Sequence, residues 1–197
     1  ARTAPLYYKI IFAVHRAQEN MKQQQLLSYM RRAINDYKMI SEGDKIAVGV
    51  SGGKDSLALL TLMHAFSKFS DKHFELMGVT VDMGFTPNAY APVEEYCEKL
   101  QIPYKIVKTD IAEIIFDVRK EKNPCSLCAK MRRGALNSEI NAMGFNKLAL
   151  GHHLDDVVET FMLSLFYEGR LSTFQPKSYM SRSGVTLIRP LVYVPEC

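Results

Sequence analysis

Long hydrophobic runs are missing from this 197-residue sequence. The longest candidate, residues 6–14, contains Lys9 and is far shorter than the ~18 apolar residues that a membrane span needs. It also lacks the small-residue cleavage site that follows a signal peptide. The sequence therefore predicts a soluble cytoplasmic protein that has no membrane as a partner.

Cysteine is scarce as well, with four residues in the chain. Cys125 and Cys128 form a C-x-x-C pair, whereas Cys97 and Cys197 are isolated, so a secreted disulfide framework is excluded. We expect Cys97, which lies among acidic residues, to be an ordinary helix residue. Internal repeats and low-complexity segments are also missing, and the length suits one α/β domain of roughly 150 residues plus an extension.

Three common site motifs are absent: the Walker loop G-x-x-x-x-G-K-S/T, the dinucleotide motif G-x-G-x-x-G and the zinc motif H-E-x-x-H. In their place, the buried run 46–50 leads into Ser51-Gly52-Gly53-Lys54-Asp55-Ser56 and then into a helical run. Glycines let the backbone approach a ligand, and free N–H groups at a helix start attract phosphate. The loop resembles the SGGxDS loop of ATP pyrophosphatases. The alternative is an ordinary turn in which Ser51 or Ser56 caps the helix.

Strand-like and helical runs alternate after Gly43. We expect strands at residues 45–50, 74–82, 103–109, 147–151 and 184–189, helices at 56–68, 92–100, 126–143 and 154–167, and a helical stretch from 110. This order predicts an α/β fold, a doubly wound, mostly parallel sheet with helices on both faces.

The expected domains follow from the same pattern. Residues 1–40 are predicted to be a basic helical extension, with a helix over 19–40. The resemblance of the Ser51–Ser56 loop to that of the ATP pyrophosphatases implies that residues 41–197 form a PP-loop ATP-binding domain, with an inserted Cys-x-x-Cys segment at about 119–134. The chain starts at alanine and stops at 195–197 without a closing element, which predicts a fragment.

A second cluster of polar residues follows the expected strand 147–151. Gly151 and His152 come at the strand end, and Asp155 and Asp156 start the next helix. Ligands of parallel sheets bind at the carboxyl ends of the strands, where Asp82 also lies. Carboxylates there are natural Mg²⁺ ligands, although capping of the helix is the simpler role, above all for Asp155. His152 and His153 could position substrate, or they could be structural.

Positive charge is unevenly distributed. Residues 1–40 hold seven Lys/Arg and two Asp/Glu, a net +5 in a chain of net +4. A second group has a single acid, Glu121, among six basic residues: Arg119, Lys120, Lys122, Lys130, Arg132 and Arg133. Such blocks suit a phosphate backbone, so we predict RNA contacts at Arg31, Arg32, Arg132 and Arg133. The alternative is that these basic residues simply lie on solvent-exposed helix faces.

The Cys125/Cys128 pair admits several interpretations from its spacing. A redox pair would lie at a helix start, a structural zinc site would need four ligands, and an iron–sulfur cluster commonly needs three or four cysteines. Buried thiols without chemistry are a further alternative.

Several spaced motifs together resemble the tRNA 2-thiocytidine synthetase family, from about Leu26 to Glu196. The matching stretches are Ser51–Ser56, Cys125–Cys128 with Arg132-Arg133-Gly134, Gly151–Asp156 with Glu159-Thr160, Phe166–Gly169, Pro176-Lys177 and Arg189-Pro190-Leu191. The resemblance implies an ATP-dependent enzyme that adenylates a cytidine in the tRNA anticodon loop and replaces its C2 oxygen with sulfur.

The resemblance also implies roles for single residues. Ser51, Gly52, Gly53, Lys54, Asp55, Ser56, Asp82, Gly151 and His152 would bind ATP, and Asp55 and Asp156 would hold Mg²⁺. Cys125 and Cys128 would hold a 4Fe–4S cluster and, with Asp55, count as catalytic. The family's third cluster cysteine follows the Arg-Pro-Leu stretch and is not found in this chain, since Cys197 lies too early. The implied partners are tRNA and a sulfur donor such as a cysteine desulfurase, with a homodimer as an open option.

Two other functions compete with this one. A lysidine-type or other PP-loop tRNA-modifying ligase shares the SGGxDS loop but needs no cysteine pair. A non-catalytic nucleotide- and RNA-binding domain would use the pair for structural zinc. Metal analysis separates these alternatives. Iron with labile sulfide indicates thiolation, stoichiometric zinc indicates the structural-zinc domain, and no metal leaves the lysidine-type ligase open.

Overall fold

The computed structural model describes residues 23–86, 88–118 and 124–196. The predictions made for residues 1–22, for the basic residues 119–123 and for Cys197 lie outside these ranges. No helix within the described ranges is long and apolar enough to cross a membrane.

Six strands form one sheet in the order β3-β2-β1-β4-β6-β5. Their bounds are β1 Asp44–Gly49, β2 Phe74–Asp82, β3 Tyr104–Lys108, β4 Lys147–Ala149, β5 Lys177–Met180 and β6 Val185–Ile188. All neighbouring strands are parallel except β5 and β6, which pair antiparallel. The predicted mostly parallel sheet is confirmed.

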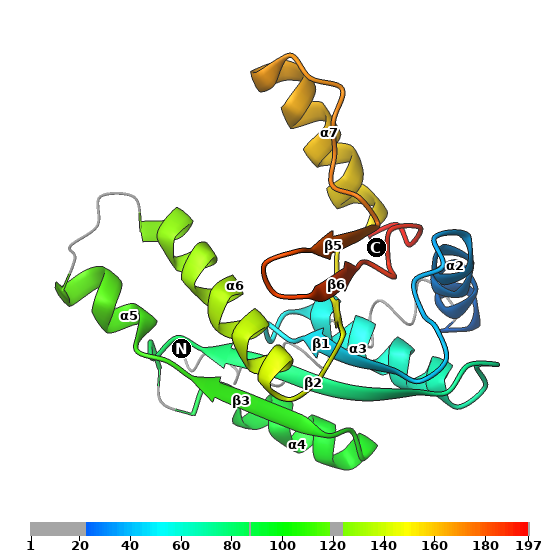
Figure 1. Ribbon diagram of the computed structural model, residues 1–197, viewed down its shortest axis with the longest axis horizontal. Coiled ribbons are helices and arrows are strands. Elements are labelled where there is room, and N and C mark those ends of the chain that lie inside the picture. The colour runs from blue at the N-terminus through cyan, green and yellow to red at the C-terminus, as the bar shows by residue number, and fades with distance from the viewer. Residues whose placement is uncertain (1–22, 87, 119–123, 197) are drawn as a thin grey trace, which may run out of the picture.

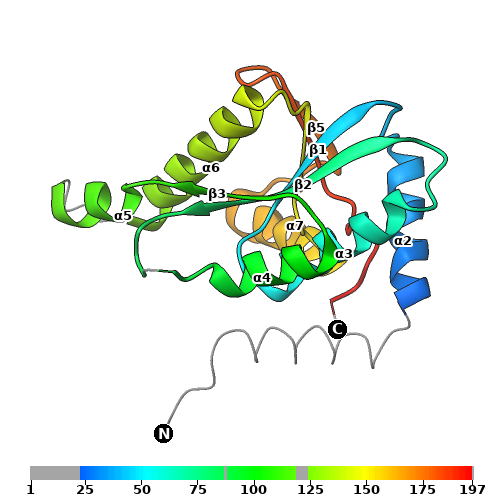
Figure 2. The same ribbon diagram turned by 90° about the horizontal axis from the view of Figure 1, so that it is seen from below.

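Helices cover both faces of the sheet, as predicted (Figure 2). Their bounds are α2 Gln23–Asp36, α3 Lys54–Ser67, α4 Ala91–Leu100, α5 Ile111–Glu113, the π-helix η1 Ile114–Val118, α6 Pro124–Ala142 and α7 Leu154–Glu168. On one face Ile46 and Val48 of β1 pack in a cluster with α2, α3 and α4. On the other face Ala47 packs in a cluster with Ile140 of α6. This alternation explains why Ile46, Ala47 and Val48 are all apolar, since both faces of β1 are buried there.

The basic helix before the sheet is present as α2. Met30, Ala33 and Ile34 are buried against the core, and Arg31 and Arg32 are exposed. The division of the chain at residue 40 remains a prediction, because α2 contributes to the same apolar cluster as α3.

Most elements begin or end within two residues of the predicted boundaries, whereas α2 ends at Asp36 rather than at residue 40. Strand β5 was not expected, and it forms a hairpin with β6 at one edge of the sheet (Figure 1). Helix α6 begins at Pro124 rather than at residue 126, so Cys125 lies within its first turn. Proline has no N–H to donate and is well suited to a helix start.

Helix α7 projects away from the sheet (Figure 1). None of its residues is buried, although Leu163, Phe166 and Tyr167 are large and apolar.

Candidate functional site

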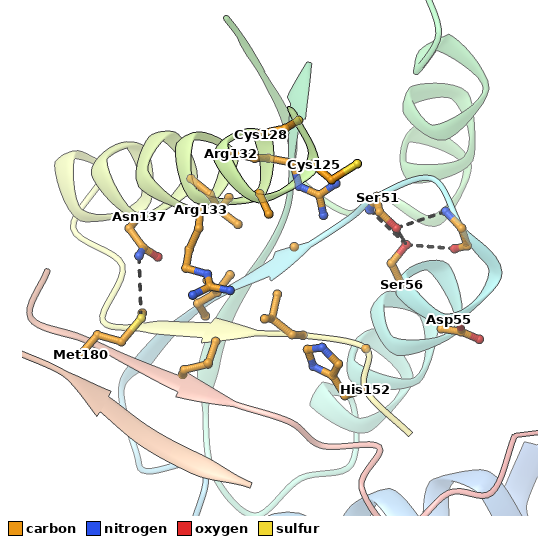
Figure 3. Close-up of a pocket in the computed structure, with 18 of the residues that line it drawn as sticks. Ser51, Asp55, Ser56, Cys125, Cys128, Arg132, Arg133, Asn137, His152 and Met180 are labelled. Atoms are coloured by element: carbon orange, nitrogen blue, oxygen red, sulfur yellow. Dashed lines mark hydrogen bonds between the residues drawn. The ribbon is translucent and has the colours of Figure 1, made fainter. Parts of the chain in front are cut away.

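A cavity of about 630 Å³ opens at the carboxyl ends of β1 and β4 (Figure 3). It lies between the loop that follows β1, the strand end that leads into α7, and the first half of α6. The lining residues with polar or reactive side chains are Ser51, Asp55, Ser56, Cys125, Cys128, Arg132, Arg133, Asn137 and His152. The cavity floor is apolar, with Leu136, Leu148, Leu150 and Leu187.

The Ser51–Ser56 loop is held by its own hydroxyl groups. The Ser56 hydroxyl accepts a hydrogen bond from the Ser51 backbone N–H (3.1 Å) and donates one to the Gly53 carbonyl (2.9 Å). Gly52 has a φ of +84°, a conformation that a side chain would strain. The loop therefore brings the start of α3, with its free N–H groups, to the cavity edge, an arrangement that suits a bound phosphate.

Gly151 lies directly against the start of α3. A Cβ atom at this position would be 2.9 Å from the Asp55 carbonyl oxygen and 3.2 Å from the Ser56 nitrogen. These are backbone atoms, which cannot rotate away. Gly151 thus lets the segment after β4 pack closely against the Ser51–Ser56 loop, and this contact sets the width of the cavity.

Charged groups surround Asp55 on the rim of the cavity. Its Oδ1 lies 3.5 Å from Lys54 Nζ and 3.3 Å from Nε2 of the nearly buried His153. Lys54 also pairs with Glu196, and that hydrogen bond is the main cause of the raised pKa of Lys54. Both partners of Lys54, Asp55 and Glu196, are partly exposed to solvent, so a phosphate could replace either of them.

The two acids at the start of α7 are both engaged. The Asp156 carboxylate accepts a hydrogen bond from the His153 backbone N–H (2.7 Å), and Asp155 accepts one from the Glu196 backbone N–H. Asp156 therefore caps the helix in this structure with one oxygen.

His152 is braced by two neighbours. Its Nδ1 accepts a hydrogen bond from Arg189 Nε (3.3 Å), and its ring lies 5.0 Å from that of Phe174. The Arg189 guanidinium in turn lies 4.6 Å from the Phe174 ring centroid. Since Nδ1 accepts, the ring proton is on Nε2, and His152 can serve as a donor into the cavity. Burial lowers the pKa of His152, and the Arg189 charge lowers it further, so the ring is neutral near pH 7.

The two thiols lie one helical turn apart at the start of α6 and both line the cavity. Cys125 is exposed, and Cys128 donates a weak hydrogen bond to the Met83 sulfur (3.3 Å). The described residues contain no group of three or more His, Cys, Asp or Glu suited to a metal. The pair therefore fits two ligand positions of a cluster and leaves the others to further ligands.

Most of the predicted site residues converge on this cavity. Six do not line it: Gly52, Lys54, Asp82, Asp156, Arg31 and Arg32. The Asp82 carboxylate accepts a hydrogen bond from the Gly84 N–H (2.9 Å). Arg31 and Arg32 lie on α2, at the opposite end of the molecule from α5 and α6 (Figures 1 and 2). The roles of all these residues remain predictions.

Sequence reasoning did not single out Phe85 and Phe116, which line the cavity, or Arg189, which donates to His152. Arg189 appears only within the Arg-Pro-Leu stretch, and its position at the end of the expected strand 184–189 was the one signal that could have revealed it. Phe85 and Phe116 lie in segments without any motif.

The parallel sheet and the glycine-rich loop define the class of PP-loop nucleotide-binding domains. The family model described as the PP-loop domain matches residues 19–196. A tRNA-cytidine(32) 2-sulfurtransferase of Alkalilimnicola ehrlichii is 44% identical over 178 residues, which cover 88% of this chain and 56% of that protein. The enzyme of the same name from Dichelobacter nodosus is 40% identical over 182 residues, which cover 90% and 68%. The chain belongs to the PP-loop family, in the tRNA 2-thiocytidine synthetase branch that these relatives represent.

Solved structures agree with the fold. The U34-tRNA thiolase NcsA from Methanococcus maripaludis, solved with its 4Fe–4S cluster, matches with a TM-score of 0.69 at 28% identity, over 88% of this chain and 60% of that one. The NH3-dependent NAD synthetase from Campylobacter jejuni matches with a TM-score of 0.55 at 14% identity, over 89% and 69%, which supports the fold alone. The chain spans about 56–68% of the length of the first curated relatives.

Proposed function

We propose that this chain is the ATP-binding, cytidine-activating part of an enzyme that replaces the C2 oxygen of a tRNA cytidine with sulfur. The observation that carries this proposal is one cavity lined by both the Ser51–Ser56 loop and the Cys125/Cys128 pair. The names of the curated relatives, which are tRNA-cytidine 2-sulfurtransferases, support the substrate and the reaction.

Activation of the base would take place at the loop. The C2 carbonyl oxygen of cytidine attacks the α-phosphorus of ATP, and the bond to pyrophosphate breaks. The N–H groups at the start of α3 and the Lys54 ammonium, released from Glu196, would stabilise the charge that develops on pyrophosphate. His152, as a neutral Nε2–H donor, would hold an oxygen of the nucleotide.

Asp55 and Asp156 are the proposed Mg²⁺ ligands. The Asp55 carboxylate is 39% exposed and lies on the cavity rim, so it can accept a cation together with phosphate oxygens. Asp156 would contribute the oxygen that does not cap α7. Bound Mg²⁺ would neutralise the departing pyrophosphate.

Cys125 and Cys128 would hold an iron–sulfur cluster, and the M. maripaludis thiolase was solved with its 4Fe–4S cluster. A bound cluster would supply the sulfur-transfer chemistry. A separate sulfur donor, such as a cysteine desulfurase, would complete the reaction.

Arg132 and Arg133 would contact tRNA phosphates, since both line the cavity near the thiols. Charge reversal at both positions should weaken tRNA binding and reduce the slope of log affinity against log salt by about two. The same change at Arg31 and Arg32 tests whether tRNA reaches the far end of the molecule. An unaltered slope removes the pair concerned from the interface.

The decisive experiment separates activation from thiolation. Protein purified without oxygen is assayed for iron and labile sulfide, for tRNA-dependent pyrophosphate release and for 2-thiocytidine. The Cys125→Ser variant should lose iron and thiolation but retain pyrophosphate release, because the loop is unchanged. The matched control is Cys97→Ala, which removes a buried thiol of α4 outside the cavity.

Three outcomes would contradict the proposal. Stoichiometric zinc in place of iron would indicate the structural-zinc alternative. Pyrophosphate release that requires free lysine would indicate the lysidine-type ligase. The absence of any tRNA-dependent pyrophosphate release would exclude cytidine activation by this chain.

A further inference from the structure

Two phenylalanine side chains lie exposed on the lining of the cavity. Phe85 is 54% exposed and Phe116 is 50% exposed, and both line the cavity with the Cys125/Cys128 pair. Their ring centroids are 5.8 Å apart at an interplanar angle of 64°, an edge-to-face pair. Large apolar side chains that remain half in water beside a cavity are typical of a binding surface rather than of a core.

The local backbone holds Phe85 in this place. The Asp82 carboxylate accepts a hydrogen bond from the Gly84 N–H (2.9 Å), and Gly84 has a φ of +84°. A Cβ on Gly84 would lie 3.3 Å from the Thr109 carbonyl oxygen, at the end of the neighbouring strand. The segment after β2, which carries Phe85, is thus closely packed at Gly84.

The position of Phe116 is set by a different feature, a π-helix. It lies on the π-helix η1, in which each turn contains an extra residue. The opposite side of this segment packs inward, since Ile111 of α5 and Ile115 of η1 are buried against α6. Such π-turns occur frequently at functional sites, because they change the direction of one side chain without ending the helix.

The charges around the pair indicate what it binds. Arg132 and Arg133 line the same cavity, and Asp55 at its other end is the only carboxylate among the described lining residues. An aromatic surface next to guanidinium groups suits a ligand with a flat π-face and phosphates, and it disfavours a cation. The floor near α6 is apolar as well.

We propose that Phe85 and Phe116 form a stacking platform for an unpaired nucleobase of RNA. This inference rests on the proposed function, because it assigns the place where the RNA strand enters the cavity. The base stacks on one of the rings, and the neighbouring phosphates bind Arg132 and Arg133. Recognition by stacking requires a base outside a duplex, since neighbouring bases cover both faces of a base within a duplex.

The test compares RNA binding by Phe85→Leu, Phe116→Leu and the double variant. Leucine retains apolar volume and removes the π-face. The matched control is Tyr179→Leu, because Tyr179 is 68% exposed, lies on the edge strand β5 and does not line the cavity. The RNA probes are an anticodon stem-loop with a cytidine in its loop and a fully paired duplex of the same length. Binding of a non-hydrolysable ATP analogue is measured in parallel.

We expect each cavity variant to lose about 5- to 100-fold in affinity for the stem-loop. Duplex binding, the salt slope and affinity for the ATP analogue should stay unchanged, and Tyr179→Leu should behave as the parent. Equal stem-loop affinity in parent and variants would overturn the platform. A loss confined to the ATP analogue would also overturn it, in favour of an adenine site.

The experiment distinguishes failure of the stacking platform from failure of the proposed function. If the parent protein releases pyrophosphate with tRNA and the Phe variants bind the stem-loop normally, only the platform is wrong. If the parent neither binds the stem-loop nor releases pyrophosphate, the proposed function is wrong too.

Discussion

Two lysine–aspartate pairs lie at opposite ends of the parallel strands and differ in their burial. At the amino ends, Lys147 of β4 pairs with Asp44 of β1, and the two side chains are 7% and 6% exposed. Asp44 also accepts hydrogen bonds from Ser41 and Asn146, and Lys147 donates to the Met39 carbonyl. This pair is completely surrounded by protein and has no room for a ligand.

At the carboxyl ends, Lys54 and Asp55 are 3.5 Å apart and 40% and 39% exposed. Their partners, Glu196 and His153, come from the chain end and from the start of α7. The same two residue types therefore hold β1 to β4 at one end and remain accessible to a ligand at the other. The comparison predicts that the first pair controls stability and the second controls chemistry.

The largest expected effect comes from breaking the buried pair. Asp44→Ala leaves the Lys147 charge buried without its partner, so we expect a loss of about 3–5 kcal/mol in the free energy of unfolding. Urea denaturation measures this loss. The control Glu75→Ala breaks the exposed Lys45–Glu75 pair and should cost less than about 1 kcal/mol. Equal losses in both variants would remove the distinction between the pairs.

The second effect is on activity. Asp55→Ala should reduce pyrophosphate release at least about 100-fold, because it removes a proposed Mg²⁺ ligand. Its free energy of unfolding should change by no more than about 0.5 kcal/mol, since the side chain is accessible to solvent. Asp71→Ala, on an exposed turn, is the activity control. Unchanged turnover would remove Asp55 from the mechanism.

The third effect tests the contact that sets the cavity width. Gly151→Ala should weaken ATP binding about 10-fold or more, because its Cβ would push against the backbone of Asp55. Isothermal titration calorimetry measures the affinity. Gly134→Ala on α6 has open space around its Cβ and should leave ATP affinity unchanged. Full ATP affinity in Gly151→Ala would show that the loop can move aside.

The fourth and smallest effect concerns protonation at the carboxyl end. Burial, and then the charge of Arg189, lower the pKa of His152 below its ordinary 6.5. Arg189→Gln should therefore raise this pKa, as measured by NMR titration, whereas Arg182→Gln on an exposed turn should not. Because the folded pKa is depressed, the unfolded state binds the proton first, and the contribution of His152 to stability is lost as the pH falls below about 6.5.

Asp44, at the amino ends of the strands, makes the stability of the protein depend on pH in a more acidic range than His152 does. Burial tends to raise the pKa of Asp44, but the hydrogen bonds from Lys147 and Ser41 outweigh it and lower the pKa. This stabilisation is present above the ordinary pKa of 3.8 and is lost as the pH falls below it. The acid-dependent loss of stability should thus be smaller in Asp44→Asn than in the parent protein.

The predictable parts of the fold are those with a strong local pattern. Strand β2 was predicted with its observed ends, Phe74 and Asp82, because an apolar run lies between clear turns. Strand β5 has four residues and no buried position, so its sequence carries no strand signal. Its formation depends on pairing with β6, which is a tertiary effect.

The site likewise has parts that the sequence predicts and parts that it does not. The loop after β1 and the glycine–histidine stretch after β4 follow from the sequence, because parallel strands end at one edge of a sheet. The brace that Arg189 and Phe174 form around His152 does not follow, since it joins three separate segments. Phe116 was equally hidden, because its direction depends on the π-turn.

The pairing of β1 with β4 has a consequence for the order of folding. Ile46 and Lys147 are neighbours in the sheet, although roughly a hundred residues separate them along the chain. Closing so long a loop is slow compared with forming the β1–turn–α3 unit, whose contacts are local. The Ser51–Ser56 loop should therefore form early, whereas its contact with Gly151 should form late. A nucleotide that requires both would bind only after this closure, so its binding can report the last step of folding.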